Sequence, residues 1–219
     1  MNTKRRLLNG AAAGGMITAP LISLLWLAER ITELNFPPFS TFNFITRLLP
    51  GPLVTLGIDL MIDTLRLLGI NVAETAKTAE QIMAILFFWI GGVVLAAAAG
   101  FLIQQFSHIR HLPLGLLLGT LFGLPPSLIN LPSTSAVAGF LHVSATLGFF
   151  LLWGWGLVFS LSRLNSLTDA DQLQVEDHEI QKVEKIDRRQ FLITLGASTA
   201  TITLTGAGLG QLLTAGDKR

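Results

Sequence analysis

Uncharged and mostly apolar runs set the hydrophobic pattern of this chain. A helix needs about 20 such residues to cross a hydrocarbon core of about 30 Å. Runs of this kind, separated by more polar segments, predict transmembrane helices at 7–28, 81–107, about 113–131, about 136–161 and 191–213. The pattern therefore predicts an all-α integral membrane protein with about five transmembrane helices.

The third and fourth predicted helices come from one charge-free stretch at 112–162. As a single helix it would extend for about 75 Å, far more than one bilayer, so it must fold back. The turn is predicted at 130–135, where Asn, Pro, Ser and Thr residues cluster. Pro125 and Pro126 are expected to kink or end the third helix, because proline lacks an N–H group and clashes with the preceding turn.

An amphipathic segment at about 48–70 separates the first two predicted spans. Thr55, Asp59, Asp63 and Arg66 follow at steps of three and four residues, which places them on one helix face, while leucines fill much of the remainder. Asp63 and Arg66 are spaced for an ion pair between residues i and i+3. The pattern indicates a helix that lies in the membrane interface. The alternative is a sixth span whose carboxylates serve a proton path.

The amino-acid composition agrees with a membrane protein and excludes several classes of function. Apolar residues make up 51% of the chain and charged residues 13%, whereas soluble domains carry about 25% charged residues. The net charge of +1 gives no basic surface for nucleic acid. The chain has no cysteine, which excludes disulfides, thiolate metal sites and covalently attached c-type haem.

The positions of lysine and arginine favour one orientation. With five spans and a cytoplasmic N-terminus, more basic residues fall on the inner side than on the outer side. The inner ones are Lys4, Arg5, Arg6, Arg110, Arg163, Lys182, Lys185, Arg188 and Arg189, and the outer ones are Arg30, Arg47, Arg66, Lys77, Lys218 and Arg219. A sixth span at 52–68 would move Arg188 and Arg189 outside. We therefore expect a multi-pass protein of the inner (plasma) membrane, with a cytoplasmic N-terminus and an extracytoplasmic C-terminus.

Histidines are the only candidate cofactor ligands that the sequence offers. Membrane cytochromes hold haem between two histidines at similar depth, and the candidates here are His108, His111 and His142. His108 and His111 fall at the inner end of the second span, so we expect them to lie in the interface. His142 falls near the outer end of the fourth span, where a hydrogen bond to a neighbouring helix is expected, with Ser144 or Thr146 as local candidates.

Small and aromatic residues within the spans predict packing and depth. Gly115, Gly119 and Gly123 recur every four residues, which places them on one face of the third helix and favours close helix packing. Tryptophans are common at membrane–water interfaces. That preference predicts interfacial positions for Trp26 near the outer side and for Trp153 and Trp155 toward the inner side.

A pair of arginines precedes the last predicted span. The sequence Asp187-Arg188-Arg189-Gln190-Phe191-Leu192, followed by a run rich in Thr, Ser and Gly, resembles a twin-arginine export signal. Its signal residues are Arg188, Arg189, Phe191 and Leu192. Asp187 stands where the pattern has Ser or Thr, and Ile193 stands where it often has Lys. The last span is expected to remain as an uncleaved anchor, with Thr205-Gly206-Ala207 as the alternative cleavage position.

Several spans, a polar linker and such a signal together resemble the membrane-anchor region of bacterial sulfite-oxidase-like, molybdopterin-dependent oxidoreductases. The segment Phe36-Pro37-Pro38-Phe39, which leads to Arg47 and Pro50-Gly51-Pro52, is also similar to the outer loop of that family. The resemblance implies an extracytoplasmic redox domain with molybdopterin, and the twin-arginine translocation machinery as a partner. The catalytic domain is expected to be encoded separately or lost by truncation, with no cofactor in this chain itself.

We therefore predict three regions. Residues 1–162 form a four-span membrane domain, 163–187 form a polar cytoplasmic linker, and 188–219 form the export signal and the C-terminal anchor. The predicted function is a membrane anchor and export module for an extracytoplasmic oxidoreductase, with no catalytic residues of its own. The alternatives are a haem-binding electron-transfer subunit and a small channel or transporter that uses Asp59 and Asp63.

Overall fold

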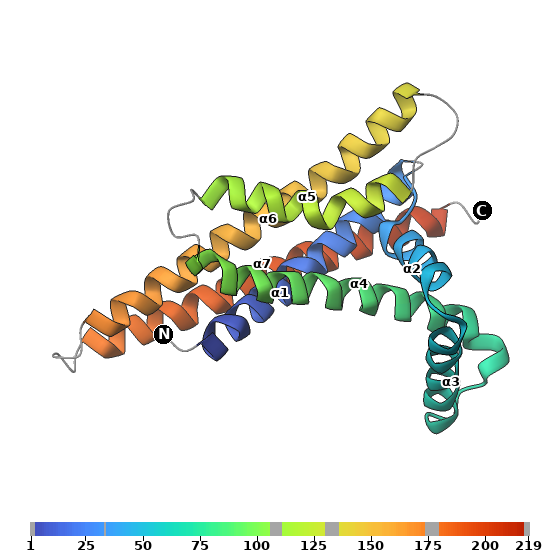
Figure 1. The fold of residues 1–219 in the computed structure, drawn as a ribbon, viewed down its shortest axis with the longest axis horizontal. Helices are drawn as coiled ribbons and strands as arrows, with labels where there is room; N and C mark the ends of the chain where they lie inside the picture. The colour runs from blue at the N-terminus through green and yellow to red at the C-terminus, as the bar shows by residue number, and fades with distance from the viewer. Residues whose placement is uncertain (1–2, 33, 106–110, 130–135, 174–179, 217–219) are drawn as a thin grey trace.

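The computed structural model of the chain describes residues 3–32, 34–105, 111–129, 136–173 and 180–216. Within these residues the chain forms seven helices and no strand (Figure 1). The helices are α1 (Thr3–Ile31), α2 (Pro37–Leu48), α3 (Gly51–Leu67), α4 (Val72–Gln105), α5 (His111–Ile129), α6 (Ala136–Leu173) and α7 (Ile180–Gly216).

Five of these helices carry the apolar stretches of a membrane protein. Four stretches are long enough to cross a bilayer, and they are Leu7–Ile31 in α1, Thr75–Leu102 in α4, Gly139–Leu164 in α6 and Arg189–Leu213 in α7. The apolar stretch of α5, Pro113–Ile129, is shorter and extends for about 25 Å. The prediction of an all-α membrane protein is confirmed.

Two of the spans differ in detail from the predicted ones. The second span begins at Thr75 rather than 81 and thereby includes Lys77 and Glu80. These side chains form an ion pair with 2.9 Å between Nζ and Oε2, so their opposite charges offset one another near the end of the span. In α5 the helix includes Pro125 and Pro126 and ends at Ile129, less than one turn later.

The bundle is arranged around α1, which contacts α4, α6 and α7, while α5 packs on α6. Gly10 contacts Ala96 whereas Gly14 contacts Gly92, so α1 and α4 run antiparallel. Helices α1 and α7 run parallel, as Figure 1 shows. One end of the bundle, called here the α3 end, therefore holds the last residues of α1, α5 and α7 together with α2 and α3. The opposite end holds the first residues of α1, α5 and α7.

Glycines allow the closest helix contacts in the bundle. A Cβ atom added at Gly119 would lie 2.5 Å from the backbone oxygen of Phe150, and one added at Gly115 would lie 2.9 Å from that of Gly154. A Cβ atom at Gly123 would meet the Phe150 side chain. The prediction that these three glycines share a packing face is confirmed, and that face is the one turned to α6.

Aromatic rings fill the centre of the bundle. Phe122 stacks on Phe88 with 4.9 Å between ring centroids and meets Phe150 edge to face at 5.2 Å. Trp153 lies 4.9 Å from Phe122, and its Nε1 donates a buried hydrogen bond of 3.0 Å to Thr18 Oγ1. The interfacial position predicted for Trp153 is wrong, because only 3% of this residue is exposed. Its polar N–H group is satisfied inside the protein rather than at the membrane surface.

Helix α3 projects from the bundle rather than joining it (Figure 1). None of its residues is buried, and at 17 residues it is not among the helices long and apolar enough to cross a membrane. The chain leaves α3 through a Schellman motif, in which Gly69 has a φ of 69°, a value that favours glycine. The amides of Gly69 and Ile70 donate to the carbonyl oxygens of Arg66 and Leu65, which ends the helix.

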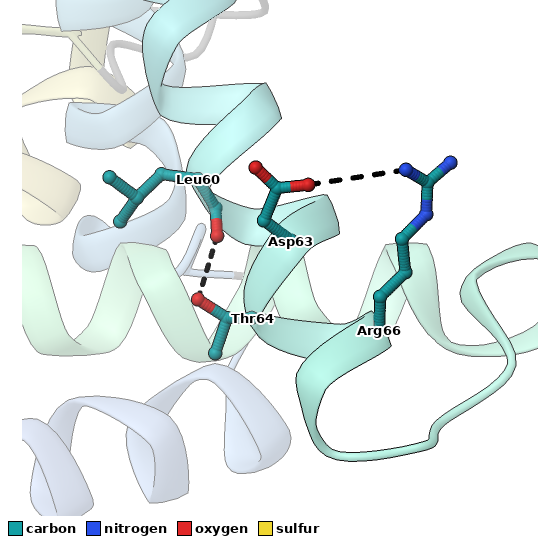
Figure 2. A network of polar contacts seen from close by, with 4 residues as sticks. All are labelled: Leu60, Asp63, Thr64 and Arg66. Carbon is teal, nitrogen blue, oxygen red and sulfur yellow. Dashed lines mark hydrogen bonds and ion pairs between the residues drawn. The ribbon is translucent and has the colours of Figure 1, made fainter.

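The polar face of α3 has the pairing that the sequence predicts. Arg66 Nη1 lies 4.0 Å from Asp63 Oδ1, and Thr64 Oγ1 donates a 2.7 Å hydrogen bond to the carbonyl oxygen of Leu60 (Figure 2). Both charged side chains are largely exposed, so the pair contributes at most about 1 kcal/mol. Exposed leucines flank this face, among them Leu53, Leu56 and Leu60. Polar and apolar faces on one projecting helix are typical of a helix in the membrane interface.

Candidate functional site

The arginine pair lies within α7, near the opposite end of the bundle. Arg188 is part of the helix, although its side chain is outside the described part of the structure. Arg189 is exposed and marks the first residue of the apolar stretch. Phe191 and Leu192 are half-buried and pack against the core. The four predicted signal residues thus form a short charged and apolar segment where α7 begins its apolar part.

Helix α7 docks on α1 through small residues. Ser23 Oγ donates a hydrogen bond of 2.8 Å to the carbonyl oxygen of Thr203. A Cβ atom added at Gly206 would lie 2.5 Å from Ser23 Oγ, and Gly210 packs directly on the Trp26 ring. Between 189 and 213 these two glycines are the only buried residues. Helix α7 is therefore a peripheral helix with a single narrow contact face.

Four hydroxyl groups of α7 donate hydrogen bonds to the backbone of the same helix. Ser198, Thr199, Thr201 and Thr203 each donate to the carbonyl oxygen four residues earlier, at distances of 2.8 to 2.9 Å. An unsatisfied polar group in hydrocarbon costs several kcal/mol, so these bonds are needed if the helix lies in lipid. With these hydrogen bonds, a helix rich in Ser and Thr can lie in a bilayer without polar groups from a neighbouring helix.

The histidines do not come together in the described structure. His142 is buried in α6, with 7% of its surface exposed, and its Nε2 atom has no hydrogen-bond partner. The expected partner Ser144 donates instead to the carbonyl oxygen of Phe140. His108 lies outside the described residues, and His111 begins α5 with its side chain outside the described part.

Helix register separates His111 from His142. Gly115 of α5 contacts Trp155 of α6, and the two helices run antiparallel. His142 is 13 residues before Trp155, about 20 Å along α6, whereas His111 lies beyond Gly115 in the other direction. One iron atom therefore cannot bind both side chains within this chain. In the described residues no group of three His, Cys, Asp or Glu side chains could hold a metal ion.

The carboxylates proposed for a transport path lie on the outside of the molecule. Asp59 and Asp63 are both exposed on α3, and they line a shallow groove along that helix together with Leu56 and Leu60. Helix α3 contacts α4 but does not enter the bundle. In this arrangement the two carboxylates lie on a helix that projects from the α3 end of the bundle (Figure 1).

A cleft between α1, α4 and α7 was not anticipated from the sequence. It is lined mainly by apolar side chains, which include Ile22, Trp26, Ile85, Trp89 and Ala207. These residues come from three different helices. Hydropathy predicts that the helices exist, but it does not predict which of them pack against one another. Trp26 lies at the α3 end of the bundle, and its position on the outer side stays a prediction. The repeated small residues of α7, Gly206 and Gly210, were the one available signal of a docked helix.

Comparison of the chain with protein-family models, with curated proteins and with solved structures found no match. Function is therefore inferred from the residues and their geometry. What these establish is a class of protein: an all-α, multi-pass membrane protein with a peripheral last helix.

Proposed function

We propose that this chain is the membrane anchor and export module of an extracytoplasmic oxidoreductase, with the opposite end of the bundle in the cytoplasm. The observation that carries the proposal is the parallel pairing of α1 and α7, held by Ser23 with Thr203 and by Gly210 with Trp26. Parallel helices enter the membrane from the same side. The basic residues before the first span and the arginine pair before the last one then face the same compartment, as a signal read in the cytoplasm requires.

The shape of α7 also supports the proposal. A segment that is inserted after the rest of the bundle must dock without rebuilding the core. Helix α7 meets that condition, because its contacts are concentrated on α1 and four of its hydroxyl groups bond to its own backbone. The molybdopterin belongs, in this proposal, to the exported domain and not to this chain.

The test is the export of a reporter that folds before translocation, fused after Arg219. With the native sequence the reporter is expected outside the cytoplasm, and export is expected to fail when Arg188→Lys and Arg189→Lys are combined. The matched control is Arg163→Lys, which changes an arginine in α6 near the same end of the bundle. Unchanged export in the double variant, or in cells that lack the twin-arginine translocase, would defeat the proposal.

A second function is favoured by one observation, the buried His142 with no partner at Nε2. Such an atom can bind haem iron, with the second ligand supplied by another chain. The absorption spectrum of the purified protein tests this directly. A haem band that disappears in the His142→Ala variant would support an electron-transfer subunit, and a native spectrum without such a band would eliminate it.

A further inference from the structure

The cleft between α1, α4 and α7 has the size and lining of a ligand site. Its volume is about 570 Å³, within the range of about 300 to 1,000 Å³ that is usual for small-molecule sites. Leu86 and Trp89 line it and remain partly exposed, with 50% and 36% of their surfaces accessible. Because these residues belong to the span of α4, the cleft opens sideways into the bilayer and not into water.

Two polar side chains of the cleft, Ser23 and Trp89, are hydrogen-bonded within the protein. Ser23 Oγ donates to the carbonyl oxygen of Thr203, and Trp89 Nε1 donates to that of Gly15 at 3.0 Å. Most of the remaining lining is formed by rings and aliphatic side chains such as Trp26 and Ile85, and Gln211 adds one polar side chain. A hydrocarbon chain fits this lining, because it needs no hydrogen bond and loses none on entry.

A cation, Arg30, lies over the ring of Trp26, which lines the cleft. Arg30 follows Trp26 by one helical turn, and its guanidinium carbon lies 5.4 Å from the centre of the Trp26 ring. Arg30 is exposed and forms no salt bridge within the described residues, although its charge also acts on the carboxylate of the adjacent Glu29. The arginine is thus fixed by its aromatic neighbour and retains its capacity to bind an anion.

The distance from this cation to the bottom of the cleft matches one leaflet. Ala19 is the deepest residue of α1 in the cleft. It lies 11 residues before Arg30, a rise of about 16 Å. Half of a hydrocarbon core of about 30 Å is nearly the same length. A lipid whose phosphate sits at Arg30 therefore reaches the end of the cleft with one acyl chain.

We propose that the cleft is a site for one anionic phospholipid of the leaflet at the α3 end. Its phosphate binds the Arg30 guanidinium, and one acyl chain lies between Trp26 and Trp89. Charge selects the lipid, since a zwitterionic headgroup brings a cation of its own close to Arg30. The site adds to the function proposed above and does not depend on it.

The test is native mass spectrometry of the full chain, exchanged into a mixture of phosphatidylglycerol and phosphatidylcholine of equal chain length. We expect the protein to retain one phosphatidylglycerol molecule with about fivefold preference. Arg30→Gln should abolish the preference, and Ala207→Phe, which fills the cleft, should reduce retention of the lipid. The matched control is Arg163→Gln, because Arg163 also lies over an aromatic ring, that of Phe159, but near the opposite end of the bundle.

Three results would overturn the proposal. Equal retention of the two lipids would mean that the site does not select a lipid by the charge of its headgroup. A preference that persists in Arg30→Gln would place the headgroup elsewhere. Retention of a neutral lipid in place of phosphatidylglycerol would show a different occupant. Because Arg30 is exposed, Arg30→Gln is expected to fold normally, and its thermal unfolding checks that point.

Discussion

At the scale of single residues, the hydrogen bond between Trp153 and Thr18 joins two helices in the centre of the bundle. Thr18 is fully buried, and its side chain packs against Gly92 of α4. Thr18→Val keeps the shape of the side chain but removes the acceptor, so the Trp153 N–H group is left unsatisfied. We expect a loss of about 1 kcal/mol in the free energy of unfolding.

This loss can be measured by thermal unfolding in detergent. The control is Thr201→Val, because Thr201 is exposed on α7 and bonds only to its own helix. Equal effects of the two substitutions would mean that the buried bond contributes nothing specific.

A contact between side chains could be predicted where both residues lie on the same helix, because their spacing in the sequence sets their distance. The pair of Asp63 and Arg66 follows from their spacing on one helix, and it is present. Trp153 was placed wrongly, because a tryptophan in a span suits either the interface or a buried site with an acceptor. Only the neighbour, Thr18 on another helix, decides between the two.

At the scale of helices, α5 and α6 are held together by close backbone contact at Gly119. Gly119→Ala would place a methyl group 2.5 Å from the oxygen of Phe150, so the helices would have to separate. We expect destabilisation of about 1 to 3 kcal/mol. Gly148→Ala is the control, since nothing lies within 4 Å of its added Cβ atom.

The two substitutions are expected to act in opposite directions. Alanine at position 148 favours the helix by about 0.5 to 1 kcal/mol relative to glycine. The melting temperatures of the two variants measure these changes in stability. A Gly119→Ala variant as stable as Gly148→Ala would show that the two helices are not in close contact.

Helix existence was largely predictable, because a charge-free run of sufficient length has few alternatives to a spanning helix. Helix ends were less predictable. Helix α4 begins at Val72, before the charge-free run, and Lys77 and Glu80 form an ion pair in its first turns. Hydropathy counts each charge alone and does not register such a pair. The polar region 163–187 is partly helical, as α6 continues to Leu173 and α7 starts at Ile180.

At the scale of the whole molecule, the parallel docking of α1 and α7 can be tested by a disulfide. The Cβ atom of Ser23 lies 3.5 Å from a Cβ atom built at Gly206, a separation suited to a disulfide. The chain has no cysteine of its own. The double variant Ser23→Cys with Gly206→Cys should therefore cross-link on mild oxidation, as mass spectrometry of its peptides can show.

The control pair is Ser23→Cys with Gly208→Cys, because a Cβ atom at Gly208 has no neighbour within 4 Å. Equal cross-linking of both pairs, or of neither, would contradict the docked position of α7. The sequence could not predict this neighbour relation. Apolar residues that face lipid and those that face another helix are alike in hydropathy, so packing order is set by small residues and by bonds such as that of Ser23.

In the topology that we propose, the bundle crosses the membrane an odd number of times and the arginine pair lies in the cytoplasm. Single cysteines at positions 68, 163 and 218, introduced as Leu68→Cys, Arg163→Cys and Lys218→Cys, can be labelled in intact cells with a thiol reagent that does not cross membranes. We expect labelling at 68 and 218 without lysis and at 163 only after lysis. Labelling of 218 only after lysis, or of 163 in intact cells, would contradict this topology.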